Sequence, residues 1–582
     1  MGYLNAIKKY DEIIVWERDD EDQRVIKRYD APYNFYIKDS EGKHMSMFGD
    51  KLSRLKFANS KDFAAAKQNC QRERIEMFES DIGPELKILS SEYYEKPVPN
   101  VHVTFWDIEV DYNPELGFSS IDNPYAPINS VALHHKWLNK TILIAVPPDN
   151  WKEQDSGGVL DDSLNDLAEI ILCKDEKELL ILLLDEIQDS DIICGWNSDF
   201  FDTPYFAKRI EKVLGKSYLR QLSFEHGNMP KYREVEMFGN MQTTIDLCGR
   251  MSVDYLALFK KYEMDGRPTY KLEAVADDIL PGLPKLHYEG TLAGLYRTDF
   301  NYFMRYNIRD TEILEGFENT LGYVQVAIDM YHLSLGLMKH ALGTIKLAEL
   351  SVINYCHHNL GLVVPNNNIN DNDGGGIMGA YVLEPKTGMH ELIGSIDIKS
   401  LYPSAIRSLN ISPEKIVGQF VDEVRAADEI AKDSMAVLSF LFEDGTTKTL
   451  RADEWRELLH ENKWAVSGFG TVFDQNEQGI IPAILDDWYA TRNKYKALQS
   501  EAEKNGNKKE EAYYDKMQYI YKIKLNSFYG ALANKYFRFY DLRMGESTTG
   551  TGRMILHHQC AKTNEIFTGK YDALGDAIVY GD

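Results

Sequence analysis

A chain of 582 residues is too long to fold around a single hydrophobic core. Because single cores stop growing at roughly 250–300 residues, we expect about three to five domains. The hydrophobic fraction of 44% is ordinary for folded domains. No segment approaches the roughly 18 consecutive apolar residues of a membrane helix, so we expect no membrane partner. The N-terminal segment becomes charged too early for a secretory signal peptide.

The cysteines and the charge indicate the compartment and the class of ligand. The six cysteines have no paired spacing, which disfavours a zinc ribbon or a disulfide framework and predicts a reducing, cytoplasmic location. They are Cys70, Cys173, Cys194, Cys248, Cys356 and Cys560. A net charge of −26 disfavours nucleic-acid binding by the chain as a whole. A local basic surface is sufficient in a large enzyme, and the segment from Arg492 to Lys524 is rich in lysine. From charge alone, a solvated helical hairpin is an equally good interpretation of that segment.

A carboxylate pair follows the apolar strand predicted at 101–106. That strand continues into Trp106-Asp107-Ile108-Glu109. Side chains two apart on a strand point to the same face, so Asp107 and Glu109 converge. Carboxylates placed in this way are natural ligands of Mg²⁺ or Mn²⁺, although acidic pairs at strand ends are common without a metal.

Two later segments add carboxylates in a fixed order. The segment from Asn197 to Pro204 (NSDFFDTP) is a polar turn that carries Asp202, and its proline is suited to open a helix. Tyr306 and Asp310 stand four apart, which places both on one helical face. A helix predicted at 175–189 and a strand at 191–196 indicate an α/β layer around these segments.

The ordered patterns D-x-E, N-x-x-x-F-D-x-P and Y-x-x-x-D resemble the three motifs of DnaQ-like 3′→5′ exonucleases, and in particular the exonuclease domain of family B DNA polymerases. The resemblance implies two divalent ions, one that activates water and one that stabilises the leaving 3′ oxygen. Their implied ligands are Asp107, Glu109, Asp202 and Asp310. Tyr306 would orient the attacking water; a packed helical tyrosine is the alternative.

A second cluster begins at residues 395–410, where an apolar strand predicted at 391–398 delivers Asp397 to a turn and a helix. The string D-x-x-S-L-Y-P-S resembles motif A of family B polymerases, which implies that Asp397 binds both catalytic metals. The resemblance places the triphosphate on backbone amides and the deoxyribose on a ring, at Ser400, Leu401 and Tyr402. Lys399 stands where the family often has a small polar residue.

The pattern K-x-x-x-N-S-x-Y-G at 522–530 resembles motif B. On a helix, Lys522, Asn526 and Tyr529 share one face, which suits a surface that grips a triphosphate and the nascent base pair. Arg492 and Lys496 are also one turn apart and resemble the R-x-x-x-K of the fingers domain. The basic stretch between these motifs is therefore predicted to form two antiparallel fingers helices.

The sequence ends Tyr580-Gly581-Asp582, the start of the family's motif C, Y-G-D-T-D-S. We expect Asp582 to be a metal ligand together with Asp397. The second motif C aspartate, the thumb and a C-terminal sliding-clamp peptide would follow, so we expect DNA synthesis by this chain alone to be weakened by several orders of magnitude. A split gene, a split intein and an artificially chosen end are all compatible with this end.

The predicted fold is a multi-domain α+β hand with an RNase H-like (DnaQ-like) exonuclease, a palm and helical fingers, and with the thumb missing. The predicted boundaries are an N-terminal domain at 1–100, the exonuclease at 101–322, a return to the N-terminal domain at 323–365, palm at 366–480 and 536–582, and fingers at 481–535. The polar run at 366–376 is the predicted linker.

Three hypotheses on function remain open. The chain is one part of a split DNA polymerase, a stand-alone exonuclease whose polymerase half only holds DNA, or a non-catalytic binding remnant. The hypothesis of a split polymerase predicts four partners: primer–template DNA, deoxynucleoside triphosphates, a C-terminal polymerase fragment and a sliding clamp. Softer sequence matches resemble replicative polymerases of T-even-type bacteriophages, which would place the protein in the cytoplasm of an infected host cell.

Overall fold

The structure is a computed structural model, and it describes residues 2–113, 115–237, 240–263, 266–368, 379–432 and 434–581. The chain forms two compact units, each built from several segments of the sequence. The first unit comprises Met1–Ala31, Pro84–His332 and Leu337–Leu342, and the second comprises Pro32–Gly83, Leu333–Gly336 and Gly343–Asp582. Within the described ranges, no helix is long and apolar enough to cross a membrane.

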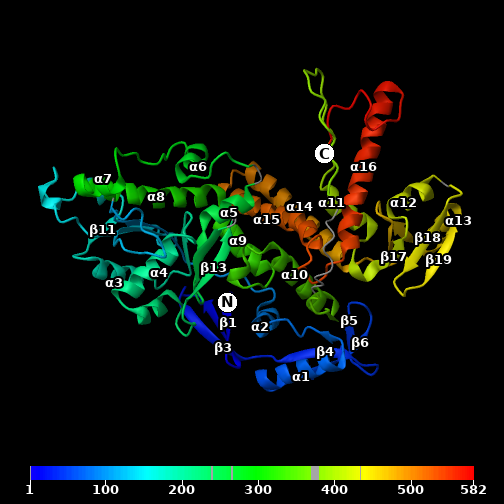
Figure 1. The fold of residues 1–582 in the computed structure, drawn as a ribbon, viewed down its shortest axis with the longest axis horizontal. Coiled ribbons are helices and arrows are strands. Elements are labelled where there is room, and N and C mark those ends of the chain that lie inside the picture. The colour runs from blue at the N-terminus through cyan, green and yellow to red at the C-terminus, as the bar shows by residue number, and fades with distance from the viewer. Residues whose placement is uncertain are drawn as a thin grey trace. The chain divides into compact units, whose positions relative to one another are not determined.

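A six-stranded sheet forms the centre of the first unit, in the order β11-β10-β9-β8-β12-β15 (Figure 1). The first three strands in sequence, β8 (Val103–Val110), β9 (Ile128–His135) and β10 (Lys140–Ala145), form an antiparallel meander. The other strands pair in parallel: β11 (Glu169–Leu172) with β10, β12 (Ile192–Gly195) with β8, and β15 (Met251–Asp254) with β12.

Helices pack on both faces of this sheet, so its central strand β9 is buried along its whole length. One face packs against α3 (Glu176–Glu186) and α4 (Asp202–Val213), and its core includes Trp106 and Ile108 of β8. The other face packs against α8 (Phe300–Leu321) through residues such as Phe303 and Ile308. Because side chains alternate along a strand, Asp107, which lies between Trp106 and Ile108, points toward the α8 face.

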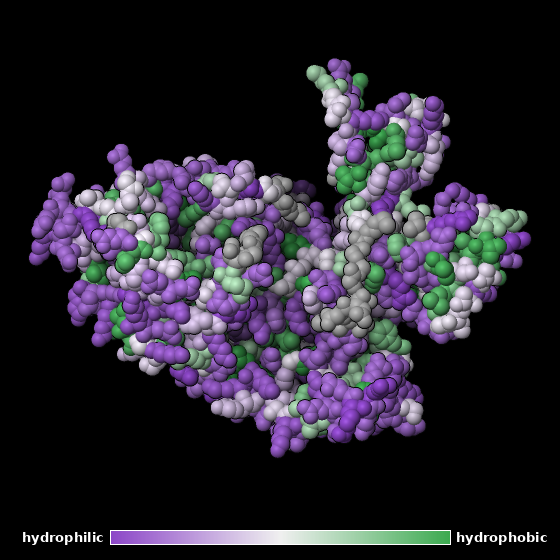
Figure 2. Space-filling view, viewed as in Figure 1, coloured by the Kyte–Doolittle hydropathy of each residue, from purple (hydrophilic) through white to green (hydrophobic). Residues whose placement is uncertain are grey.

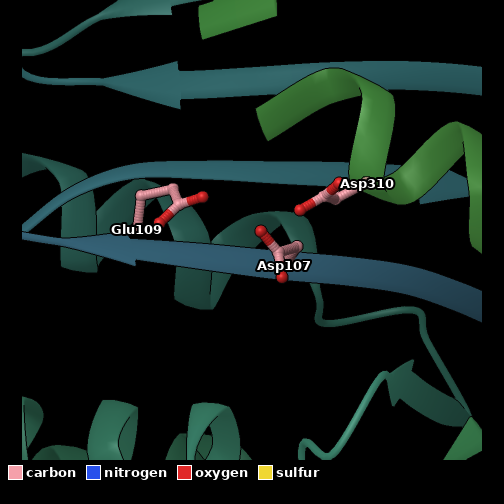
Figure 3. Close-up of side chains that lie close together, drawn as sticks. All are labelled: Asp107, Glu109 and Asp310. Atoms are coloured by element: carbon pink, nitrogen blue, oxygen red, sulfur yellow. The ribbon is translucent and has the colours of Figure 1, made fainter. Parts of the chain in front are cut away.

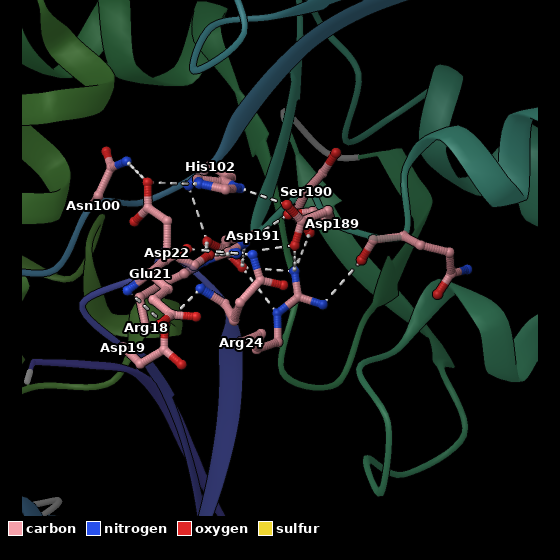
Figure 4. A network of polar contacts seen from close by, with 12 residues as sticks. Arg18, Asp19, Glu21, Asp22, Arg24, Asn100, His102, Asp189, Ser190 and Asp191 are labelled. Carbon is pink, nitrogen blue, oxygen red and sulfur yellow. Dashed lines mark hydrogen bonds and ion pairs between the residues drawn. The ribbon is translucent and has the colours of Figure 1, made fainter.

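A network of buried charges joins a small N-terminal sheet to this central sheet within the first unit (Figure 4). The small sheet consists of β1 (Tyr3–Lys9), β2 (Glu12–Arg18) and β3 (Arg24–Asp30). Arg18 and Arg24 lie 3.0 and 2.7 Å from the same Oδ1 of Asp191. The backbone N–H of His102 donates to the other oxygen of that carboxylate at 2.9 Å. The side chains of Arg18 and Asp191 are 1% and 0% exposed, so each buried charge depends on the other.

The second unit contains two further sheets. In the first, of order β16-β5-β6-β4-β7, strands from the beginning of the chain pair with β16 (Leu362–Val363). Its other strands are β4 (Asn34–Lys38), β5 (His44–Ser46), β6 (Lys51–Lys56) and β7 (Met77–Phe78). In the second, of order β19-β18-β17-β21-β20, the strands pack on α12 (Glu423–Ala431) and α13 (Ala452–Asn462) around Trp455. These strands are β17 (Ile416–Phe420), β18 (Val437–Phe442), β19 (Thr447–Arg451), β20 (Trp464–Val466) and β21 (Thr471–Asp474).

Two long helices, α14 (Ile480–Lys504) and α15 (Lys508–Leu532), pack against each other as an antiparallel hairpin. Tyr495 of α14 stacks on both Tyr514 and Tyr521 of α15. The hairpin agrees with the helix pair predicted from the basic segment. Helices α11 (Leu401–Leu409) and α16 (Leu542–Thr568) pack beside it.

The strand predicted at 391–398 is wrong, because residues 379–398 form no strand. A strand needs a paired neighbour, and within the described residues no backbone N–H of 391–398 donates to another backbone group. Apolar side chains of the segment, such as those of Leu392 and Ile396, are exposed rather than buried against a sheet. Most of the predicted linker at 366–376 lies outside the described residues.

Candidate functional site

Three carboxylates of the first unit converge on one point. One oxygen each from Asp107, Glu109 and Asp310 lies within 4.8 Å of the other two. Figure 3 shows the first two side chains rising from β8 and the third descending from α8 toward them. Asp310 is 4% exposed. Mutually repelling charges are therefore held close together at a partly buried place.

Local structure explains this convergence. Asp107 and Glu109 alternate with the core residues of β8, so both point to the face on which α8 packs. Asn307 of the same helix holds the first of them: its Nδ2 donates to Asp107 Oδ2 at 2.8 Å. Ser130 on β9 donates in turn to Asn307 Oδ1 at 2.8 Å, which fixes the orientation of the amide.

Asp202 lies beside this trio without joining it. It is the first residue of α4 and is 5% exposed. Its Oδ1 accepts a hydrogen bond from the backbone N–H of Ile108 at 3.3 Å. Its negative charge contributes to the raised pKa of Asp107, so the two carboxylates share one electrostatic environment.

Burial raises the pKa of every member of the group, and neighbouring carboxylates raise it further at Asp107, Glu109 and Asp202. Burial first, and then the charge of Asp310, raise the pKa of Glu109 to about 8. Burial also raises the pKa of Asp202 to about 7. The pKa of Asp107 is raised by burial and then by the charges of Glu109, Asp310 and Asp202. The protein therefore concentrates negative charge where only a cation or protons can neutralise it.

One cation from the chain itself reaches the cluster. Lys285 Nζ lies 2.7 Å from Asp310 Oδ2 and 4.8 Å from the centre of the Tyr306 ring. Burial alone would lower the pKa of Lys285, but the carboxylate of Asp310 and the hydroxyl of Tyr306 raise it above its usual value. The ring of Tyr288 meets that of Tyr306 edge-on at 5.2 Å. The hydroxyl of Tyr306 is thus held near the carboxylates by a lysine and a second ring.

The donor set fits a hard divalent cation. Asp310 Oδ1 is buried and has no hydrogen-bond partner among the described residues. An unsatisfied buried carboxylate oxygen is costly, and a cation bound there would satisfy it. Oxygen ligands alone, without cysteine or histidine, favour Mg²⁺ or Mn²⁺ over zinc.

A hollow of about 590 Å³ opens at the end of β8. It begins at Asp111, two residues beyond Glu109, and its wall includes Tyr112, Tyr125 and Arg297. The guanidinium of Arg297 binds Asp111 with two hydrogen bonds, of 2.6 and 2.8 Å. The wall of this hollow therefore combines aromatic rings with an ion pair.

The residues of the second predicted site lie in the second unit. Asp397 is exposed and belongs to no carboxylate cluster within the described part of the chain. Ser400 precedes α11 with φ 54° and ψ 53°, a left-handed conformation that costs a residue other than glycine about 1 kcal/mol. Leu401 and Tyr402 are the first residues of α11, and the Tyr402 ring packs on Tyr529 of α15 with 4.5 Å between ring centres.

The predicted cations gather on the helix hairpin. Arg492 first, and then burial and the charges of Lys399 and Lys522, lower the pKa of Lys496, which shows that these side chains share one field. Asn526 is exposed. The predicted metal ligand Asp582 lies outside the described residues.

Sequence reasoning missed two residues of the first site. Lys285 lies in a loop between α6 (Leu272–Ile279) and α7 (Leu292–Thr298), where a single lysine carries no periodic signal. Asn307 is next to Tyr306, and a buried asparagine within a helix is the signal that could have identified it.

Comparison with known proteins identifies two domains of one family. Residues 63–275 match the exonuclease domain of DNA polymerase family B, and residues 346–582 match DNA polymerase family B itself. The two segments together hold more than three quarters of the chain. The chain therefore belongs to DNA polymerase family B.

Phage and viral polymerases are among its relatives. The DNA-directed DNA polymerase of Escherichia phage RB69 is 24% identical, with 93% of this chain aligned to 64% of that protein. The enzyme of Enterobacteria phage T4 is 28% identical over 64% of this chain and 44% of its own length. A DNA polymerase of Paramecium bursaria Chlorella virus NY2A is 25% identical over 84% of this chain and 51% of its own length. The predicted similarity to T-even phage polymerases is confirmed, and the chain spans less than two thirds of the length of these relatives.

Proposed function

We propose that the first unit is a divalent-metal-dependent 3′→5′ exonuclease that removes nucleotides from a DNA strand. The observation that carries this proposal is the convergence of Asp107, Glu109 and Asp310, with a buried oxygen of Asp310 left without a partner. The strand order supports an RNase H-like fold for this domain, since an antiparallel meander is extended by two parallel strands.

The residues of the site would divide the work as follows. The trio, with Asp202 beside it, would hold the metal ions, and Asn307 would fix the orientation of Asp107. Bound divalent ions supply a lowered pKa for the attacking water and charge neutralisation at the leaving 3′ oxygen. The hydroxyl of Tyr306, held by Lys285, would orient that water.

The hollow beside Asp111 would receive the terminal nucleotide. Its tyrosines offer stacking surfaces that accept any base, as removal of both correct and mispaired nucleotides requires. Arg297 is neutralised by Asp111 in this arrangement, so the binding of a phosphate would compete with an existing ion pair.

We further propose that the second unit is the polymerase part, with palm at 366–480 and 536–582 and fingers at 481–535. The observation in favour is the group of cations on α14 and α15, the two helices against which α11 packs. These cations would bind the triphosphate of an incoming nucleotide, and Tyr402 on Tyr529 would form the floor under its sugar.

A further polypeptide is proposed to complete the polymerase site. Large apolar side chains are exposed around the end of α16 and in the segment before α11: Leu392, Ile393, Ile566, Phe567 and Leu574. Figure 2 shows hydrophobic atoms gathered over the end of α16. Phe567 alone is 76% exposed. A group of large exposed apolar side chains is typical of an interface, and on this proposal DNA synthesis requires the polypeptide that covers them.

A nuclease assay tests the first proposal. The chain would be incubated with Mg²⁺ and a 5′-labelled single strand, beside Asp107→Asn and the exposed control Glu153→Gln. We expect wild type and the control to shorten the strand one nucleotide at a time, and Asp107→Asn to leave it intact. Equal degradation by Asp107→Asn would refute the assignment. Extension of a primer–template by this chain alone, with nucleotides present, would refute the need for a further polypeptide.

A further inference from the structure

Lys399 occupies a defined place on the surface of the second unit. Its Nζ lies 5.5 Å from the centre of the Tyr489 ring on α14. The guanidinium of Arg407 lies 4.8 Å from the centre of the same ring. A hydrogen bond from Lys399 is also the largest cause of the lowered pKa of the Tyr489 hydroxyl. The lysine is therefore directed toward α14, although its side chain is exposed.

Tyr489 stands at one end of the cationic face of that helix. Residues 489, 492 and 496 are spaced by three and four, so their side chains lie on the same side of α14. Lys522 of α15 belongs to the same group of cations. Its charge, like that of Lys399, lowers the pKa of Lys496.

These four cations have no acidic partner. Within the described part of the chain, no ion pair involves Lys399, Arg492, Lys496 or Lys522. The Nε of Arg492 is buried and has no hydrogen-bond partner among the described residues. In a protein of net charge −26, four neighbouring cations without a carboxylate indicate a site for an external polyanion.

We propose that Lys399 is a phosphate-binding residue of the polymerase site, the fourth cation that holds the triphosphate, and that Tyr489 positions it. This inference rests on the proposed function of the second unit. A triphosphate carries several negative charges on closely spaced oxygens, which four neighbouring cationic side chains can neutralise together. Ser400, next in sequence, holds a left-handed conformation that fixes the chain as it enters α11.

Calorimetric titration of the full chain with tripolyphosphate, and then with dATP, tests this inference. The variants are Lys399→Gln, Lys399→Arg, Lys522→Gln and Lys494→Gln. Lys494→Gln is the control, because it changes the net charge by the same amount. Lys494 is exposed and lies two residues from both Arg492 and Lys496, which places it on another side of α14. Circular dichroism would establish that each variant is folded.

We expect Lys399→Gln to weaken the binding of both ligands about tenfold, as the loss of one hydrogen bond to a charged group predicts. Lys399→Arg should retain most of the affinity, and Lys494→Gln should bind like wild type. If Lys399→Gln binds as tightly as Lys494→Gln while Lys522→Gln binds more weakly, the inference is overturned and the proposed function stands. Absence of binding by wild type, or binding insensitive to Lys522→Gln, would overturn both.

Discussion

Replacement of Glu109 by glutamine should stabilise the metal-free protein, and the effect should depend on pH. Burial and the charge of Asp310 raise the pKa of Glu109 to about 8, whereas a free glutamate has a pKa near 4.3. Between these values the folded state holds a proton that the unfolded state has lost. The free energy of unfolding of the wild type therefore falls as pH rises through this window, by at most about 1.4 kcal/mol per pH unit.

The magnitude follows from that window. The full interval between the two pKa values would correspond to roughly 5 kcal/mol of unfolding free energy. Partial exposure and solvent screening reduce this value, so above the folded pKa we expect Glu109→Gln to be about 2 kcal/mol more stable than the wild type. Glutamine carries no charge at any pH. Glu109→Gln should therefore exceed the wild type in stability at about pH 8 and match it below about pH 5.

Urea unfolding in EDTA, followed by tryptophan fluorescence at several pH values, measures this difference. The control is Glu153→Gln, an exposed glutamate of the same unit. Addition of Mg²⁺ should stabilise the wild type and have little effect on Glu109→Gln, since ligands that bind only the folded state raise its stability. A wild type as stable as Glu109→Gln at alkaline pH in EDTA would refute the repulsion on which the metal site depends.

The remaining predictions concern single side chains. Asn307→Ala should lower the rate of DNA-strand hydrolysis about 10- to 100-fold, because it frees Asp107 from its 2.8 Å hydrogen bond; an unchanged rate in single-turnover assays would show that this bond is not needed. Asp191→Ala should lower the free energy of unfolding by about 3–5 kcal/mol, since it removes the buried carboxylate that pairs with the buried Arg18. Asp189→Ala, which removes a 54% exposed partner of the same arginine, should cost less than about 1 kcal/mol in the same denaturation experiment. Lys524→Met should stabilise the second unit below pH 7, because burial lowers the pKa of Lys524 to about 7. In thermal unfolding scans this gain in stability should shrink as the pH rises toward about 10.4, the pKa of a free lysine. A gain in stability that grew with pH would contradict the lowered pKa.

The sequence is sufficient to predict the local parts of the carboxylate cluster. Period-two alternation places Asp107 and Glu109 on one face of a strand, and the four-residue spacing places Tyr306 and Asp310 on one helix. Their convergence depends on the packing of α8 over β8, which periodicity does not encode. The order of the motifs along the chain predicts it only through the resemblance to a known family.

Other contacts lie beyond sequence reasoning because they join distant residues through tertiary structure. Lys285 reaches Asp310 from a loop without periodic pattern, and Arg18 contacts Asp191, which lies 173 residues further along the chain. The missing strand at 391–398 illustrates the opposite error: its apolar residues suit a strand, but a strand forms only beside a paired neighbour.

Mn²⁺ binding followed by electron paramagnetic resonance tests the central claim most directly. Wild type and the control Glu153→Gln should bind the ion, and Asp107→Asn and Asp310→Asn should each lose the binding that is assigned to the trio. Loss of binding in both aspartate variants, with folding retained by circular dichroism, is the predicted result. Identical Mn²⁺ titrations for the wild type and both variants would contradict the account.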